Sequence, residues 1–156
     1  MISFFSSKRW SAKSEDGVAA TEFAVVLPLL LLIVLGIMDF GKAMNYWIDE
    51  NHLASTGARW AAVNRNPGPG ATLQQSIQQQ ADTSELRGAT VCVSFPNGAA
   101  VGQPVQVTMR LDYEWLPYIA NRLSIATTTI SGTATMRLEA IPSTYEAGAG
   151  GTGTCA

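Results

Sequence analysis

Residues 17–38 read GVAATEFAVVLPLLLLIVLGIM, an apolar stretch long enough to cross a membrane as a helix. The 21 residues from Val18 to Met38 would cover roughly 31 Å at 1.5 Å per residue, which matches the hydrocarbon core of a bilayer. No later part of the chain is as hydrophobic, so the sequence predicts a single membrane pass. Pro28 lies inside this segment and predicts a modest kink, which membrane helices tolerate.

One acidic residue, Glu22, lies near the start of this apolar segment. A carboxylate within a hydrocarbon span costs on the order of 2.5–3.5 kcal/mol at the centre, so it usually has a partner or a function. If the chain were cut after Gly17, the new α-amine of Val18 would lie one helical turn before Glu22, on the same face. That ion pair would form within one chain or between neighbouring subunits. The alternative is an uncleaved signal anchor, with Glu22 at headgroup level near the positive end of the helix.

Basic residues predict the orientation in the membrane. Lys8, Arg9 and Lys13 precede the apolar segment, whereas only Lys42 lies in the 20 residues after Met38. Because positive residues are retained in the cytoplasm, the leader is expected there and the remaining chain outside. A secretory signal fits less well, since the apolar run is long and no Ala-x-Ala site closes it.

The helical pattern continues past the membrane segment, and nothing in the sequence stops it before the Asn66-Pro67 pair. Small residues recur at three- and four-residue spacing on one face, where they let another backbone approach closely: Ala54, Ala58, Ala61 and Ala62. The sequence therefore predicts one long helix from Val18 to about Asn64, amphipathic over residues 39–64.

Several motifs in this helix resemble those of a known family. Gly17, Glu22, Phe23, the run Asp39-Phe40-Gly41 and the segment GARWAA at 57–62 are similar to the TadE-like proteins, minor pseudopilins of the tight-adherence (Flp/Tad) pilus. The resemblance covers roughly residues 16–64.

This resemblance implies a function in pilus assembly and cell adhesion. It implies cleavage between Gly17 and Val18 by a prepilin peptidase, and it assigns Glu22 and Phe23 to assembly and neutralisation of the new N-terminus. The implied location is the bacterial cytoplasmic membrane, and the implied partners are that peptidase, the lipid bilayer, other pilins and pseudopilins, and the membrane platform of the pilus machine.

After residue 64 the sequence predicts a small α+β head over residues 65–146. The run NPGPG at 66–70 separates it from the long helix. Thr72 and Gln75 fit a capping box, followed by a helix of about three turns with a solvated, glutamine-rich face.

The rest of the head alternates apolar and polar residues with a period of two. Three strands are predicted, with these residues on one apolar face: Val91, Val93, Phe95; Val105, Val107, Met109, Leu111, Tyr113; Ile130, Ala134, Met136, Leu138. A turn at Pro96-Asn97-Gly98 joins the first two as an antiparallel hairpin. The second half of the long helix is the expected cover for this face.

The chain contains two cysteines, Cys92 and Cys155. In an oxidising compartment they are candidates for one disulfide, which would fasten the glycine-rich tail at 147–156 to the polar, outward face of the first strand. Free thiols, or thiols paired between chains, are the alternative, because sequence alone gives no distance.

Residues that carry catalysis or bind cofactors are few. The single histidine, His52, lies near Asp49 and Glu50 without further metal ligands at workable spacing, so we expect no metal site, no cofactor and no catalytic residues. A net charge of −2 gives no indication of nucleic-acid binding. Residues 114–119 (EWLPYI) either bind a partner or close the end of the core. An unprocessed, membrane-tethered binding module is the alternative function, and an anchored hydrolase would require a polar cleft in the head.

Overall fold

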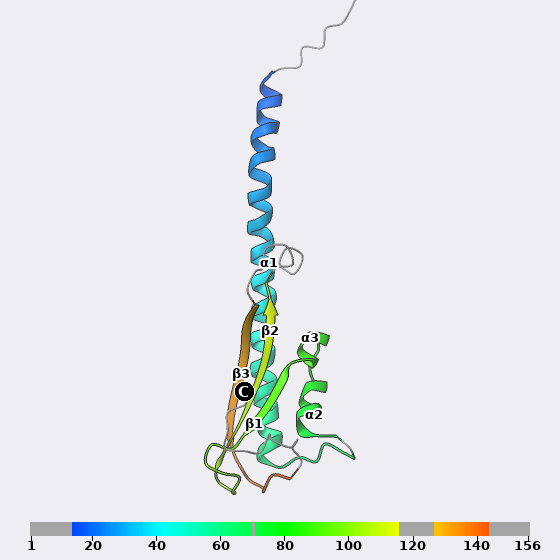
Figure 1. Ribbon diagram of the computed structural model, residues 1–156, viewed down its shortest axis with the longest axis vertical. Helices are drawn as coiled ribbons and strands as arrows, with labels where there is room; N and C mark the ends of the chain where they lie inside the picture. The colour runs from blue at the N-terminus through cyan, green and yellow to red at the C-terminus, as the bar shows by residue number, and fades with distance from the viewer. Residues whose placement is uncertain (1–13, 70, 116–126, 144–156) are drawn as a thin grey trace, which may run out of the picture. The chain divides into compact units, whose positions relative to one another are not determined.

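The computed structural model describes residues 14–69, 71–115 and 127–143. The chain divides into two compact units between Met38 and Asp39. The first helix, α1 (Ser14–Ala62), contributes residues to both units, and the later elements all belong to the second unit (Figure 1). The architecture is α+β, as the sequence predicted.

The described part of the first unit is the beginning of α1. The helix begins at Ser14, four residues before the predicted start at Val18. Acidic residues at positions 15 and 16 are of the type that favours the positive end of a helix, which accounts for the extension into the leader. Pro28 lies inside the helix without ending it.

The remaining part of α1, from Asp39 onward, has one buried face. The residues on this face recur at three- and four-residue spacing, which confirms the amphipathic pattern: Ala43, Tyr46, Glu50, Leu53, Ala54, Gly57, Ala58, Ala61 and Ala62. Gly57 is the point of closest packing. A Cβ atom there would lie 2.6 Å from the Cδ1 atom of Ile77 and 3.2 Å from Cγ1 of Val107. A helix and a strand therefore both pack against α1 at this glycine.

Helix α1 ends at Ala62 in a Schellman motif. The amide of Arg65 donates to the carbonyl of Trp60 at 2.9 Å, and the amide of Asn64 donates to the carbonyl of Ala61 at 3.1 Å. Asn64 has a φ of 49°, the left-handed conformation that this motif requires. The helix thus ends two residues earlier than predicted, because Asn64 turns the backbone before the first proline is reached.

Two short helices follow. α2 (Leu73–Gln79) has the predicted capping box, in which Thr72 and Gln75 bond reciprocally. It is shorter than the three turns predicted, because Thr83 caps a separate helix, α3 (Ser84–Arg87). The glutamine-rich face is also not wholly solvated as predicted. Gln74 is buried, and the Gln78 side chain donates to the carbonyl of Ala89 at 2.9 Å.

The sheet has the predicted three antiparallel strands in the order β1-β2-β3, with bounds β1 (Thr90–Ser94), β2 (Pro104–Glu114) and β3 (Thr127–Arg137). Val93 of β1 pairs with Val107 of β2, which pairs with Ala134 of β3. The predicted turn is present, because the Gly98 amide donates to the Phe95 carbonyl at 3.0 Å.

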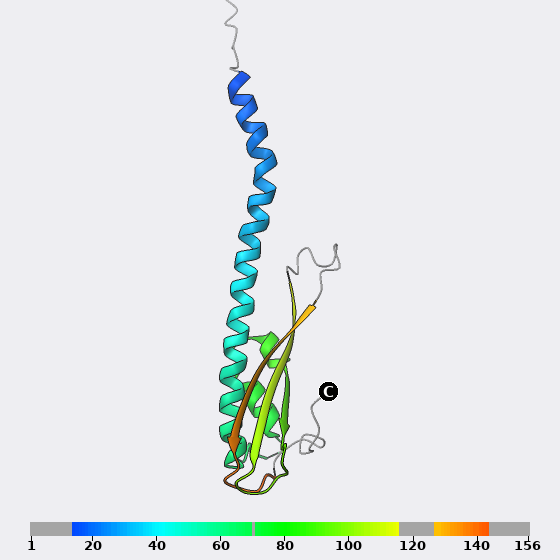
Figure 2. The ribbon, with the colours of Figure 1, turned by 90° about the vertical axis from the view of Figure 1, so that its left-hand side faces the viewer.

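The apolar face of the sheet packs against the buried face of α1, as predicted. Figure 2 shows the three strands along one side of the helix, and Figure 1 shows α2 and α3 beside β1. Buried residues of α1, of the two short helices and of the sheet form one hydrophobic cluster, among them Leu53 of α1, Ile77 of α2, Leu86 of α3 and Val107 of β2.

Candidate functional site

The predicted processing and assembly residues lie together at the start of α1. Gly17, Val18, Glu22 and Phe23 are all exposed, and no atom lies within 4 Å of a Cβ built on Gly17. The hydroxyl of Thr21 donates to the carbonyl of Val18 at 2.8 Å. Val18 and Glu22 are one helical turn apart on the same face of α1. The Gly17–Val18 bond lies within the first turn and is accessible in this unit.

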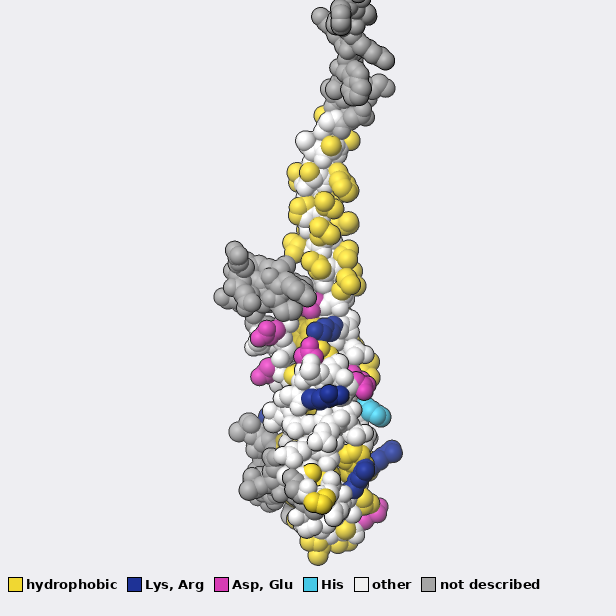
Figure 3. Space-filling view, turned by 90° about the vertical axis from the view of Figure 1, so that its right-hand side faces the viewer, with side chains coloured by type: hydrophobic (Ala, Val, Ile, Leu, Met, Phe, Trp, Pro, Cys, Tyr) yellow, Lys and Arg dark blue, Asp and Glu magenta, His cyan; other side chains and the backbone are white. Residues whose placement is uncertain are grey.

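The apolar segment that follows exposes large hydrophobic side chains on every side of the helix. Val25, Leu29, Ile33 and Ile37 are each more than half exposed, and other large hydrophobic residues between them are exposed too. Figure 3 shows hydrophobic side chains covering this part of α1 on the face in view. A helix that is apolar on all sides is suited to lipid or to a bundle of similar helices. By length and composition, α1 is the helix among the described residues that qualifies to cross a membrane.

A second cluster lies in the other unit, where the end of β2 contacts α1. The hydroxyl of Tyr113 donates to Asp39 Oδ1 at 2.6 Å. The ring of Tyr113 makes edge contacts with Tyr46 and Trp115, at centroid distances of 5.7 and 5.1 Å. Burial and the bond to Asp39 raise the pKa of Tyr113, so its hydroxyl remains a donor at neutral pH. The indole Nε1 of Trp115 donates to Thr128 Oγ1 at 2.8 Å. Aromatic packing and these two bonds together join β2 and β3 to the beginning of α1 in this unit.

Glu50 is a buried carboxyl group on the sheet-facing side of α1. Its side chain has no solvent-exposed area, and neither carboxyl oxygen has a hydrogen-bond partner among the described residues. Burial raises the pKa of Glu50 to about 8, so the group is mostly protonated at neutral pH. Strand β3 passes the helix backbone at this level. A Cβ on Gly132 would lie 2.5 Å from the backbone nitrogen of Asn51 and 2.6 Å from the carbonyl oxygen of Glu50.

Of the two cysteines, Cys92 is among the described residues and Cys155 is not. Cys92 is buried, with 5% of its surface exposed, and it pairs with Thr108 of β2 in the sheet. The sequence placed Cys92 on the polar, outward face of the first strand, and its burial does not contradict that placement. Cys155 lies outside the described residues, so the pairing of Cys92 with Cys155 stays a prediction.

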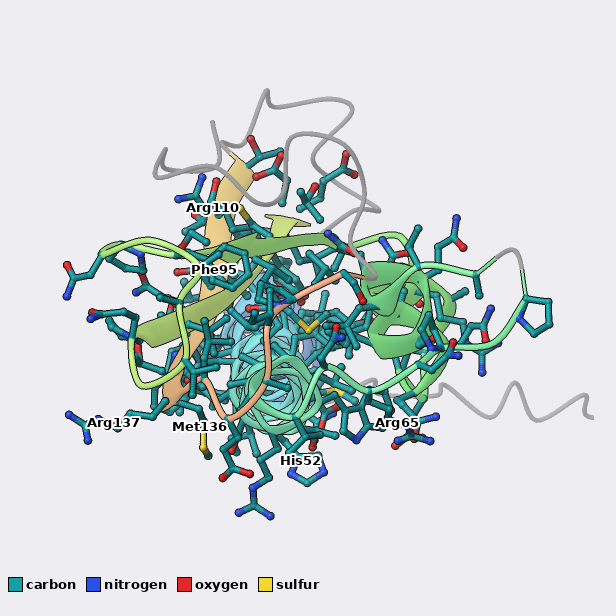
Figure 4. All side chains as sticks on the ribbon, turned by 90° about the horizontal axis from the view of Figure 1, so that it is seen from below. His52, Arg65, Phe95, Arg110, Met136 and Arg137 are labelled. Atoms are coloured by element: carbon teal, nitrogen blue, oxygen red, sulfur yellow. The ribbon has the colours of Figure 1, made fainter. Side chains whose placement is uncertain are left out.

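The other candidate positions give no cluster that could perform chemistry. Figure 4 shows the His52 side chain pointing outward from α1, away from the sheet. Within the described ranges, no group of three or more His, Cys, Asp or Glu residues could hold a metal ion. Of the apolar segment at 114–119, Glu114 and Trp115 are described, and residues 116–119 lie outside the described part of the chain.

The helix that carries the processing motif matches a known family. Residues 17–59 match the family model TadE, described as TadE-like protein. Residues 17–59 are a TadE-like region. This confirms the resemblance inferred from the sequence over the region that contains the processing motif and the apolar segment. The TadE-like region begins at the glycine of the predicted processing site and includes Glu22, Phe23 and Glu50. No curated protein and no solved structure matched the chain.

Sequence reasoning did not assign a role to Glu50 or Gly132. The sequence reasoning considered Glu50 only beside His52 as a metal ligand, and it did not consider Gly132. Glu50 lies four residues after Tyr46 and four before Ala54, within the buried stripe of α1. Gly132 occupies the inward position between Ile130 and Ala134, where a large apolar residue would be expected. The periodicity of the helix places Glu50 among its buried residues, and the alternation of the strand places Gly132 on its apolar face. An acidic residue and a glycine at such positions are the signals by which sequence analysis could have found them.

Proposed function

We propose that this chain is a pilin-like subunit, a pseudopilin, that takes part in assembling a tight-adherence pilus. It is made with a basic leader, inserted in the cytoplasmic membrane by residues 18–38, and cut after Gly17 by a prepilin peptidase. The head then lies on the extracytoplasmic side. The observation that carries this proposal is the TadE-like match over residues 17–59, which includes the processing motif and the whole apolar segment.

In the proposed mechanism, Glu22 neutralises the α-amine of Val18. The two groups are one turn apart on an exposed face, so the carboxylate reaches the amine of its own chain or of a neighbour. No ion pair of Glu22 with another described residue competes for it. Pairing the two charges avoids the free-energy cost of an unpaired charge among apolar helices. That cost is on the order of 2.5–3.5 kcal/mol per charge at the bilayer centre.

The first test is the N-terminus of the mature protein. Intact mass and N-terminal sequencing of the chain purified from its native membrane should give a start at Val18. A chain that still begins at Met1 would contradict processing and favour the membrane-tethered binding module. A chain cut after Met38 would contradict the retained anchor and favour a secreted head.

The second test separates assembly from insertion. Glu22→Gln keeps the shape of the side chain but loses its charge, so incorporation into pili should fall by at least about tenfold, equivalent to 1.4 kcal/mol. Membrane insertion, measured by fractionation, should be unchanged. Glu15→Gln is the matched control, because it alters a carboxylate of the leader that processing removes. Equal incorporation of Glu22→Gln and the unaltered chain would overturn the role of Glu22.

A further inference from the structure

The sheet of the second unit ends on β3, and one edge of this strand has no neighbouring strand. β2 pairs along one side of β3, and no described strand pairs along the other. The unpaired edge of a strand presents a row of backbone N–H and C=O groups to which another strand can bond. β3 offers such an edge over the 11 residues Thr127–Arg137.

The opposite edge of the sheet is protected, whereas the edge of β3 is not. β1 has only 5 residues, and α2 lies beside it (Figure 1). Proteins commonly protect an edge strand with proline, lysine or a β-bulge. β3 contains neither proline nor lysine. Its pairing with β2 runs one to one along its whole length, from Glu114↔Thr127 to Pro104↔Arg137, so it has no bulge either.

An apolar groove, the edge groove, runs along this unpaired edge. Its volume is about 520 Å³. Its lining consists of Phe40, Ala43, Met44 and Trp47 from α1 and of Trp115, Thr129, Ile130 and Ser131 from the sheet, none of which is ionisable. Successive side chains of a strand point to opposite faces, so three consecutive residues of β3 can line one groove only along an edge of the strand. Because β2 occupies the other edge, the edge groove follows the unpaired one.

The α1 wall of the edge groove is an apolar stripe that the three strands leave uncovered. Phe40, Met44 and Trp47 lie at helical spacing and are 58%, 40% and 48% exposed. The stripe ends one turn later at Asn51, whose side chain donates to the carbonyl of Trp47 at 2.7 Å. From Phe40 to Trp47 the stripe is roughly 10 Å long, which corresponds to about three residues of an extended strand. A fourth strand beside β3 would cover it.

We propose that the edge groove binds an extended segment of a partner protein, which adds to β3 as a fourth strand. The backbone of this segment bonds the unpaired edge of β3, and its alternate side chains pack on the stripe between Phe40 and Trp47. An antiparallel direction continues the pairing of β1, β2 and β3. The partner segment therefore has alternating apolar and polar residues, with no charge on its apolar face.

The two surfaces together select this kind of occupant. A helix or a lipid chain would cover the apolar stripe of α1 but would leave the backbone groups of β3 unpaired. A polar strand would bond β3 but would leave the stripe exposed. Only an extended segment with an apolar face satisfies both surfaces. This inference goes beyond the proposed function, because it requires neither cleavage after Gly17 nor assembly into a pilus.

The test measures binding of a synthetic strand to the full chain purified in detergent. The probe is a fluorescent peptide in which threonine alternates with valine or phenylalanine, with a lysine at each end for solubility. Its control is the same peptide with N-methylated backbone amides, which keeps every side chain but cannot donate to β3. Fluorescence anisotropy should show about tenfold tighter binding of the unmethylated peptide, the equivalent of about one hydrogen bond. Hydrogen exchange should slow in the fragment that covers residues 127–137.

A pair of variants tests the stripe on α1. Trp47→Ser removes the largest side chain of that wall and should weaken binding of the unmethylated peptide by on the order of tenfold. Ile141→Ser is the matched control and should bind as the unaltered chain does, since Ile141 is exposed and does not line the edge groove. Both side chains are largely exposed, so neither substitution should shift the urea midpoint of the head.

Four results would overturn the added strand. Equal binding of the two peptides would mean that the edge groove recognises apolar side chains alone, and equal binding by Trp47→Ser would exclude the stripe. No binding, or binding without slower exchange in residues 127–137, would exclude the edge of β3. Exchange that slows with protein concentration in the absence of peptide would make a second copy the occupant. The N-terminus and pilus incorporation are measured separately, so failure here is distinguishable from failure of the proposed function.

Discussion

The two parts of α1 use their apolar side chains in different ways. Residues 18–38 expose them on all sides. From Asp39 to Ala62 one face is buried under the sheet, and four large apolar side chains stay exposed on the rest of the helix: Phe40, Met44, Trp47 and Ile48. Helix propensity does not distinguish the two parts, since both contain good helix formers as well as glycine. What differs is the arrangement of polar residues around the helix, and that arrangement selects lipid or neighbouring helices in one case and a protein core in the other.

Each part also contains a glutamate in apolar surroundings. Glu22 is exposed on a helix that is apolar all round, and a charge partner from the processed N-terminus is proposed for it. Glu50 is buried within the head, where neither oxygen has a hydrogen-bond partner among the described residues. A carboxyl group without a partner is more stable when protonated, whereas one beside an amine is more stable when charged. Glu50 is therefore stabilised in apolar surroundings by protonation, whereas an ion pair with the new N-terminus is proposed for Glu22.

The largest expected effect concerns the pH dependence of head stability. The pKa of Glu50 is about 8 in the folded state against an ordinary value of 4.5, so the folded state holds the proton more tightly. The free energy of unfolding should therefore fall as pH rises from about 5 to about 8, by up to about 1.4 kcal/mol per pH unit. Below and above this window the contribution of Glu50 is constant. Urea unfolding of the detergent-solubilised chain, followed by tryptophan fluorescence, measures the slope.

Glu50→Gln should flatten this slope, because the amide stays neutral at every pH. The variant should match the unaltered chain near pH 5 and exceed its stability near pH 8. Glu139→Gln, at an exposed carboxylate of the same unit, is the control and should retain the original slope. Identical slopes for Glu50→Gln and the unaltered chain would show that Glu50 is hydrated in the folded head.

The second effect compares one substitution in the two parts of α1. Leu53 is 5% exposed and Leu31 is 50% exposed. Leu53→Ala should destabilise the head by about 3 kcal/mol through lost burial and a cavity. Leu31→Ala should leave head unfolding unchanged, because it removes no contact of that unit. Equal losses in the urea midpoint would mean that the difference between the two parts does not hold in solution.

The third effect tests the close approach of β3 to α1. Gly132→Ala places a methyl group against the helix backbone at Glu50 and Asn51, and backbone atoms cannot move aside as a flexible side chain would. A loss of about 2 kcal/mol in the free energy of unfolding is expected from such overpacking. Gly41→Ala is the matched control, since no atom lies within 4 Å of its Cβ position and alanine favours helix by about 1 kcal/mol. If Gly132→Ala were as stable as the control, the distance between β3 and the backbone of α1 would be larger than in the structure.

The difference between the two parts of α1 was predictable from sequence because it depends on local periodicity. The long helix, the capping box at Thr72 and the three alternating strands each follow from residue type and spacing, with bounds that shift by a few residues at the helix ends. The processing motif and the apolar segment could also be predicted from the sequence, because each consists of neighbouring residues. These features need no knowledge of which element packs on which.

Tertiary contacts could not be predicted in the same way. Gly132 is required only because β3 crosses α1 at Glu50 and Asn51, which lie 82 and 81 positions earlier in the chain. Trp115 and Ile130 line the edge groove together with Phe40 and Met44 of α1. The periodicity of a single segment cannot reveal that these residues come together. The pKa of Glu50 follows from what covers it. Each of these features arises from contact between distant segments, which sequence patterns do not encode directly.

The smallest effect concerns the end of α1, at Asn64. Its φ of 49° is strained for a residue with a Cβ atom, and its side chain offsets this by bonding Ser143 twice, as donor at 2.8 Å and as acceptor at 3.0 Å. Asn64→Ala keeps the strain and loses both bonds, so the urea midpoint should report a loss of about 1 kcal/mol. Asn64→Gly loses the bonds but also the strain, and should lie closer to the unaltered chain. If alanine and glycine were equally destabilising, the bonds to Ser143 would account for the effect and the left-handed backbone would contribute nothing. If glycine were more stable than asparagine, the bonds would be too exposed to matter, and the Schellman motif alone would end the helix.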